Sequence, residues 1–185
     1  LRFKYWVPSV ITLCGFSNIQ TLDFRDAPEN TTVILRYQYL TEIASLTIPE
    51  SEYVTRIEVR HCSDLQAFRL DGFYPNLESI HFEDVENLAY LAAPYQGDAP
   101  KLLFPTETNW LDDLPSLRLL KIPGTSIQCG SFLYEESGVL HRSLREIDIR
   151  DTTVNAEAFA RLRSIPSLRV VRVGECPNLS RDAIS

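Results

Sequence analysis

The sequence lacks the features that mark several common classes of protein. The 185-residue chain has no methionine, and its 18 basic residues are outnumbered by 25 acidic ones. The net charge of −7 argues against a nucleic-acid binder, because such proteins normally carry a basic surplus. No apolar run approaches the roughly 18 residues of a membrane-spanning helix, so no membrane insertion is expected. The missing methionine predicts a fragment, or a processed form, of a longer protein.

Motifs for catalysis and metal binding are also missing. None of His61, His81 and His141 lies in an HExxH or CxxC arrangement, and neither GxSxG nor a phosphate-binding loop is present. Cys62 follows His61 directly, but neighbouring residues at a strand exit point in different directions, which argues against a Cys–His catalytic pair. The sequence therefore predicts a protein that is not an enzyme and needs neither a cofactor nor a metal.

The composition that is present is that of a folded domain. Hydrophobic residues make up 44% of the chain and charged residues 23%, which is ordinary for a soluble protein. We therefore interpret residues 1–185 as a single domain. Near the amino terminus, Arg2 and Lys4 precede an apolar stretch, as in a signal peptide, but Pro8 breaks that stretch and Val10–Thr12 fits a first strand equally well.

A repeated pattern of apolar residues organises the chain. The pattern LxxLxLxx followed by a final slot recurs six times, beginning at Ile19, Val54, Leu77, Leu117, Leu144 and Leu168. Inside each unit the apolar residues alternate with period two, which is typical of a strand. The final slot holds only alanine, cysteine, valine or threonine, at Ala27, Cys62, Val85, Thr125, Thr152 and Cys176. We expect this slot to turn inward at a tight bend after the strand.

The segments between these units carry signals of their own. After Thr152, Asn155 is a candidate N-cap of a helix that has Phe159 and Leu162 on one apolar face. The prolines and the lack of a period in Ala92–Trp110 predict an inserted loop.

One further segment, Ile43–Ser51, also fits the strand pattern but begins only 11 residues before Val54. It is either a unit with a very short return or a strand on the opposite face, and we favour the second.

Two stretches resemble a known superfamily. LRVVRVGECPNLSRDAI, from Leu168 to Ile184, is similar to the repeats of F-box substrate receptors. YPNLESIHFEDVENLAYL, from Tyr74 to Leu91, is similar to the irregular repeats of plant nucleotide-binding immune receptors. Residues 19–185 thus resemble leucine-rich repeat proteins of the irregular, cysteine-containing type. The resemblance implies an α/β solenoid with a curved parallel β-sheet on the concave side and irregular or helical returns on the convex side.

Charged residues line the predicted concave sheet. The position between the last two apolar residues of each unit points away from the core, and in the six units it holds Asp23, Glu58, His81, Lys121, Asp148 and Arg172. A second column, two residues later, holds Arg25, Arg60, Glu83, Pro123, Arg150 and Gly174. These columns are either a solvated face that keeps the sheet soluble or a surface that orients a protein ligand. We favour binding for the face as a whole, because solenoids usually bind through this surface.

The inserted loop offers a second candidate surface. Tyr95, Phe104 and Trp110 are aromatic residues of the kind enriched at binding hot spots, although Phe104 and Trp110 would equally fold the loop back onto the core. The predicted function is a recognition module within a larger receptor or adaptor. Its partners would be proteins and other domains of the parent chain, not nucleic acid. The alternative is a structural scaffold element that packs against other domains or subunits.

The cysteines indicate a compartment. Cys14, Cys62, Cys129 and Cys176 form no terminal cluster of the kind that closes extracellular leucine-rich repeat proteins, so we interpret them as reduced, mostly buried thiols. This favours an intracellular location, cytoplasmic or nuclear. Glycosylation sequons at Asn30 and Asn178 keep a secreted or cell-surface location as the alternative.

Overall fold

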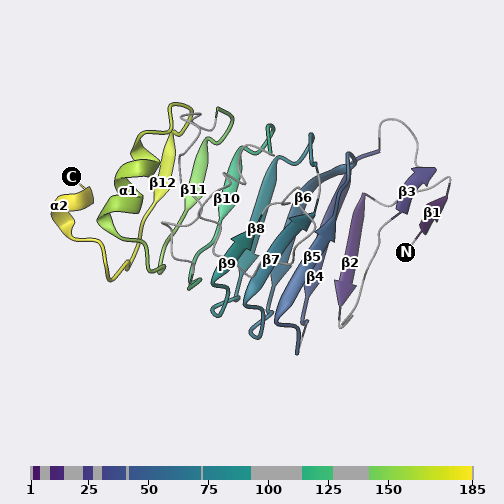
Figure 1. The fold of residues 1–185 in the computed structure, drawn as a ribbon, viewed down its shortest axis with the longest axis horizontal. Helices are drawn as coiled ribbons and strands as arrows, with labels where there is room; N and C mark the ends of the chain where they lie inside the picture. Colours follow the sequence, from purple (N-terminus) through teal and green to yellow (C-terminus); the bar gives the residue numbers. More distant parts are fainter. Residues whose placement is uncertain are drawn as a thin grey trace, which may run out of the picture.

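A computed structural model describes residues 2–4, 9–14, 23–26, 31–40, 42–71, 73–92, 114–126 and 142–184. In it, parallel strands stack side by side in a solenoid (Figure 1). The largest sheet, here called the main sheet, has seven strands in the order β12-β11-β10-β8-β6-β4-β2. Their bounds are β2 (Val10–Cys14), β4 (Val33–Gln38), β6 (Val54–Arg60), β8 (Ser79–Glu83), β10 (Leu119–Lys121), β11 (Glu146–Asp148) and β12 (Val170–Arg172).

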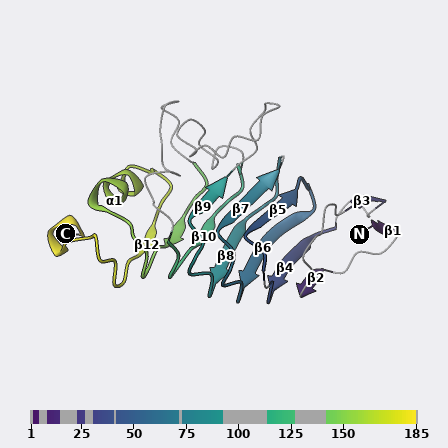
Figure 2. The same ribbon diagram turned by 60° about the horizontal axis from the view of Figure 1, so that its bottom comes forward.

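A second parallel sheet lies in the return segments, on the other side of the core (Figure 2). It contains β5 (Ser45–Pro49), β7 (Ala67–Asp71) and β9 (Tyr90–Ala92). The two sheets share one core, since the buried ring of Phe68 in β7 packs edge-on against that of Phe82 in β8, with 5.1 Å between centroids. The segment Ile43–Ser51 therefore lies on the opposite face, which confirms the favoured alternative.

The expectation that the unit beginning at Ile19 belongs to the main sheet is wrong. Its strand, β3 (Asp23–Asp26), pairs instead with β1 (Arg2–Lys4) in a separate two-stranded sheet. The main sheet is completed by β2 and β4, which recur with spacings close to those of the other strands: Thr12 is 24 residues before Arg36, which is 22 before Glu58. β4 does not fit the repeat pattern, because Thr32 stands at the first apolar position and the large residue Leu40 in the final slot.

A bend with left-handed backbone follows β4, β6, β8, β10 and β11. The residues with positive φ at these bends are Tyr39 (53°), His61 (52°), Asp84 (53°), Gly124 (66°) and Asp151 (58°). The residue after each of these bends occupies the inward slot, and the predicted slot residues Cys62, Val85, Thr125, Thr152 and, after β12, Cys176 are all buried. The two threonine hydroxyls donate hydrogen bonds to the carbonyls of Ile122 and Ile149, at 2.9 and 2.7 Å. The predicted slot is thus confirmed for these five units, while Ala27 lies outside the described residues.

The thiols occupy different environments. Cys62 and Cys176 are free and buried in their slots, and burial raises the pKa of the Cys62 thiol. Cys14 is free but exposed at the end of β2, and Cys129 lies outside the described residues. Within the described part of the chain, no helix has the length and apolar content of a membrane-crossing segment.

The predicted helix is confirmed as α1 (Ala156–Arg163), with Phe159 and Leu162 buried; a second helix is α2 (Arg181–Ile184). The Asn155 side chain caps α1 by accepting a hydrogen bond from the Ala158 N–H at 2.9 Å. An N-cap amide satisfies a backbone donor that has no partner within the helix.

We expect Asn155→Ala to lower the free energy of unfolding by about 1 kcal/mol. Urea titration followed by circular dichroism measures this loss. The conservative Asn155→Asp variant should retain wild-type stability, because its carboxylate accepts the same bond. Equal midpoints for the wild type and Asn155→Ala would show that packing alone defines the start of α1.

Candidate functional site

The outer face of the main sheet, which is the face turned away from the core, brings most of the predicted charged residues together. Glu58 lies opposite His81, which lies opposite Lys121; Lys121 lies opposite Asp148, and Asp148 opposite Arg172. These five residues therefore form a continuous ladder, as predicted. Beyond Glu58 the ladder continues through residues that the repeat pattern missed, Arg36 and Thr12. A period-two reading of VILRYQ at Val33–Gln38 would have found Arg36.

The second predicted column is also found on this face, apart from its first member. Arg60 lies opposite Glu83 and its Nε is 3.3 Å from the carboxylate. Gly174 lies directly against the Arg150 side chain, because a Cβ atom added at Gly174 would be 3.1 Å from Arg150 Cγ. The absence of a side chain at Gly174 thus leaves room for Arg150. Arg25 belongs instead, like Asp23 of the first column, to β3 outside the main sheet.

Glu58 is the centre of a buried charge cluster. Its carboxylate accepts a hydrogen bond from Arg36 Nε at 2.7 Å, and Arg56 Nε and Arg60 Nη2 lie 2.8 and 3.1 Å from it. The Glu58 side chain is 2% exposed, whereas those of the three arginines are 31 to 37% exposed. Desolvation raises the pKa of Glu58, but the Arg36 hydrogen bond and the arginine charges outweigh it and lower the pKa. Glu58 is therefore an ionised anchor beneath three guanidiniums, and neither a solvated side chain nor an exposed contact for a partner.

His81 belongs to the same cluster as a neutral side chain. Arg56 Nη2 lies 3.0 Å from His81 Nδ1, so the guanidinium donates and the imidazole accepts. Burial, followed by the positive charges of Arg56 and Lys121, lowers the pKa of His81 to about 4. The imidazole thus carries its proton on Nε2 at neutral pH, where this buried atom has no hydrogen-bond partner among the described residues.

A second buried carboxylate lies three strands further along. Asp148 is 1% exposed and holds Arg150 through two parallel hydrogen bonds, from Nε at 2.9 Å and from Nη2 at 2.8 Å. This bidentate geometry is the strongest arrangement of an arginine and a carboxylate. Arg172, next to Asp148, donates from Nε to Glu146 at 2.9 Å. Asp148, like Glu58, is thus neither solvated nor exposed for direct contact with a partner.

The outer face is consequently more basic than the whole chain. Its strands, together with Arg150 just after β11, carry six basic side chains against four acidic ones, although the chain has a net charge of −7. Two of the four acids, Glu58 and Asp148, are buried, whereas Arg150 and Arg172 are 53 and 52% exposed. The groups of this face that are accessible to solvent, or to a partner, are therefore mainly guanidinium and ammonium groups, and the carboxylates of Glu58 and Asp148 lie buried beneath them.

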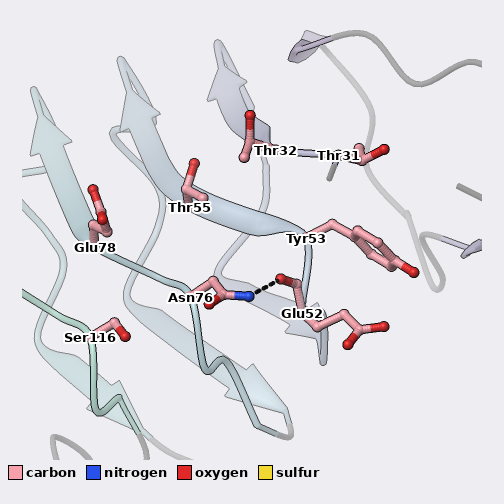
Figure 3. A pocket seen from close by; sticks show the side chains of 8 residues that line it. All are labelled: Thr31, Thr32, Glu52, Tyr53, Thr55, Asn76, Glu78 and Ser116. Atoms are coloured by element: carbon pink, nitrogen blue, oxygen red, sulfur yellow. Dashed lines mark hydrogen bonds between the residues drawn. The ribbon is translucent and has the colours of Figure 1, made fainter. Parts of the chain in front are cut away.

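A polar pocket of about 660 Å³ lies along the leading edge of the main sheet, where the chain enters the strands (Figure 3). It is lined by Thr31, Thr32, Glu52, Tyr53, Thr55, Asn76, Glu78 and Ser116. Two of these residues already bind the backbone of the preceding turn: Asn76 Nδ2 donates to the Glu52 carbonyl at 2.8 Å, and Ser116 donates to that of Pro75. The sequence pattern did not predict this pocket, because all its residues except Thr55 precede the strands and they share no residue type.

Other predicted features lie outside the described residues, including Tyr95, Phe104 and Trp110 of the inserted loop. Among the residues that the structure describes, no group of three or more histidine, cysteine, aspartate or glutamate side chains is placed to hold a metal ion. Comparison of the chain with protein-family models, curated proteins and solved structures finds no match. The functional argument therefore rests on the geometry of the outer face.

Proposed function

We propose that this protein is a non-catalytic recognition module of the leucine-rich repeat type that binds a protein partner through the outer face of the main sheet. The observation that carries the proposal is the array of exposed cations held in place by two buried carboxylates, Glu58 and Asp148. Charged side chains that are already oriented lose less conformational entropy on binding. They also accelerate association with a partner of complementary charge.

The alternative is that these charges only keep the sheet soluble, but this does not explain why carboxylates of the outer face are buried. Exposed, separate ion pairs would serve solubility, and each contributes about 0–1 kcal/mol. Burying a carboxylate instead costs desolvation energy that only good geometry with its partners can offset. The cluster around Glu58 therefore favours the interpretation that this surface binds a partner, because binding requires the arginines in defined positions.

The repeat type is supported by features found together in the chain. The LxxLxLxx pattern, the left-handed bend and the inward slot of cysteine or threonine recur along the main sheet. The free buried thiols of Cys62 and Cys176 support an intracellular setting.

A scaffold is the second candidate, and β12 favours it. Val171 and Val173 are only partly buried, whereas the equivalent Ile147 and Ile149 of the preceding turn are fully buried. Val170 on the outer face is 39% exposed. Another domain or subunit of the same assembly would cover these side chains by packing against β12.

The test is partner capture by proximity labelling with a charge-reversed variant. We expect Lys121→Glu with Arg172→Glu to reduce capture of a specific partner at least tenfold, because two cations of the outer face become anions. The matched control, Arg161→Glu with Arg163→Glu, reverses two charges on α1 and should capture the partner like the wild type. Circular dichroism verifies the folding of both.

The outcome distinguishes the two candidates. Undiminished capture by the folded outer-face variant would refute recognition through this face. Loss of capture only in Val170→Glu would identify β12 as the contact and favour the scaffold.

A further inference from the structure

Three arginines form a row at the leading edge of the last three main-sheet strands. Arg118, Arg145 and Arg169 follow the first leucine of the units LRLLKI, LREIDI and LRVVRV. The Arg145 N–H donates to the Arg118 carbonyl at 2.9 Å, and the Arg169 N–H to the Arg145 carbonyl at 2.8 Å. The three residues therefore lie side by side on consecutive strands, about 4.8 Å apart. All three are exposed.

The row differs from the other arginines of the main sheet in its lack of counter-charges. Each of the five on the outer face lies against a carboxylate: Arg36, Arg56, Arg60, Arg150 and Arg172. Within the described part of the chain, Arg118, Arg145 and Arg169 form no ion pair. Like charges on adjacent strands repel each other, so the row does not help the sheet to form.

The surroundings of the row strengthen its positive charge. Lys121 lies in β10, three residues after Arg118, and also forms no ion pair with a described carboxylate. The acids on these strands, Glu146 and Asp148, are already occupied by Arg172 and Arg150. Four cations over β10, β11 and β12 are thus left without an acidic partner among the described residues.

The row of arginines ends at β8, where the equivalent residue is acidic. The position that Arg118 occupies before β10 is held before β8 by Glu78, whose carbonyl accepts the Arg118 N–H at 2.8 Å. Glu78 and Glu52 line the polar pocket. The basic area therefore covers three strands and ends at the polar pocket, which holds these two glutamates.

We propose that the row Arg118–Arg145–Arg169 binds an acidic segment of the protein partner, with guanidiniums paired to aspartate or glutamate carboxylates. The inference rests on the proposed function and specifies the chemistry of the partner. Guanidinium groups match carboxylates with two parallel hydrogen bonds. A short acidic segment fits a basic area three strands wide, whereas a nucleic-acid strand that continued along the edge would meet Glu78 and Glu52 within about one Debye length.

The test uses defined probes in fluorescence anisotropy. A labelled oligoglutamate peptide is titrated with the full chain at low salt and at about 0.15 M salt, where charges are screened beyond about 8 Å. We expect binding at low salt that weakens at higher salt, and that weakens roughly tenfold in Arg145→Gln with Arg169→Gln. The control Arg161→Gln with Arg163→Gln removes the same charge from α1 and should bind like the wild type.

Each outcome has a defined meaning. If peptide binding weakens equally in both double variants, the binding depends only on the net charge of the protein, and the proposal is overturned. Tighter binding of an oligothymidylate than of the peptide would replace the acidic segment by nucleic acid. Absence of peptide binding, with partner capture still dependent on Lys121 and Arg172, would overturn the acidic-segment inference and leave the recognition function standing. Failure of both experiments would remove the recognition function as well.

Discussion

Replacing Glu58 by glutamine is expected to lower the free energy of unfolding by about 2–3 kcal/mol. Glutamine has the same shape but no charge, so Arg36, Arg56 and Arg60 would lie close together with no carboxylate between them. Their partial exposure, 31 to 37%, lets them turn toward solvent, which keeps the loss below that of a wholly buried charge cluster. Urea unfolding at pH 7 measures the difference.

Glu83→Gln is the matched control, because it removes one carboxylate from the same face. Glu83 is 55% exposed and contacts only Arg60, at 3.3 Å, among the ion pairs of the described residues. An exposed pair of this kind contributes at most about 1 kcal/mol. If Glu58→Gln is no more destabilising than Glu83→Gln, the arginines do not depend on Glu58 for their positions.

The burial of Glu58 also changes how the recognition surface has to be tested. The sequence alone places Glu58, Asp148 and Arg172 in one exposed ladder, and so predicts that a change at any of them removes binding and leaves folding intact. The structure shows that Glu58 and Asp148 are 2 and 1% exposed, so changes there affect stability first. Arg172, which is 52% exposed, remains suitable for separating binding from folding.

Lowering the pH from 7 to 5 is expected to destabilise the protein by about 1–2 kcal/mol through His81 alone. The pKa of His81 is about 4 in the folded protein, against 6.5 for an ordinary histidine. Between these values the unfolded chain binds a proton that the folded chain does not. Stability therefore falls as the pH drops through this range, and the loss from His81 is complete below pH 4.

The carboxylates change stability in the same direction but at lower pH. The pKa values of Glu58 and Asp148 are lowered, because the hydrogen bonds and charges of their arginines outweigh the effect of desolvation. Their stabilising effect is present above the ordinary carboxylate range and is lost as the pH falls through their folded-state pKa values. Between pH 7 and 5 the contribution of His81 is therefore measured largely by itself.

His81→Gln isolates this contribution. Glutamine can still accept the hydrogen bond of Arg56 but does not titrate, so urea unfolding of the variant should lose most of the difference between pH 7 and 5. His61→Gln, outside the cluster, should keep it. An NMR titration provides the direct measurement: an imidazole of His81 that protonates near pH 6.5 in the folded protein would contradict the prediction.

Much of the fold could be predicted because the repeat is a local signal. Period-two alternation, followed by a slot that holds alanine, cysteine, valine or threonine, sets which side chains face the core, and a shift by one residue would place all of them on the wrong side. This is why the ladder from Glu58 to Arg172 and the inward position of Thr152 followed from the pattern. The cap at Asn155 followed from an equally local rule.

The tertiary structure alone decided the features that depend on neighbouring turns. The pattern does not identify Arg36, because β4 departs from it at Thr32 and Leu40. The unit that contains Asp23 fits the pattern but lies in another sheet. Nothing local distinguishes the acids at Glu58 and Asp148 from solvated ones, because their burial comes from arginines whose side chains fold over them. Similarly, the sequence determined that Arg118, Arg145 and Arg169 recur in equivalent positions. Only the stacking of the strands showed that they form a row without described counter-charges, since ion pairing depends on which side chains meet in space.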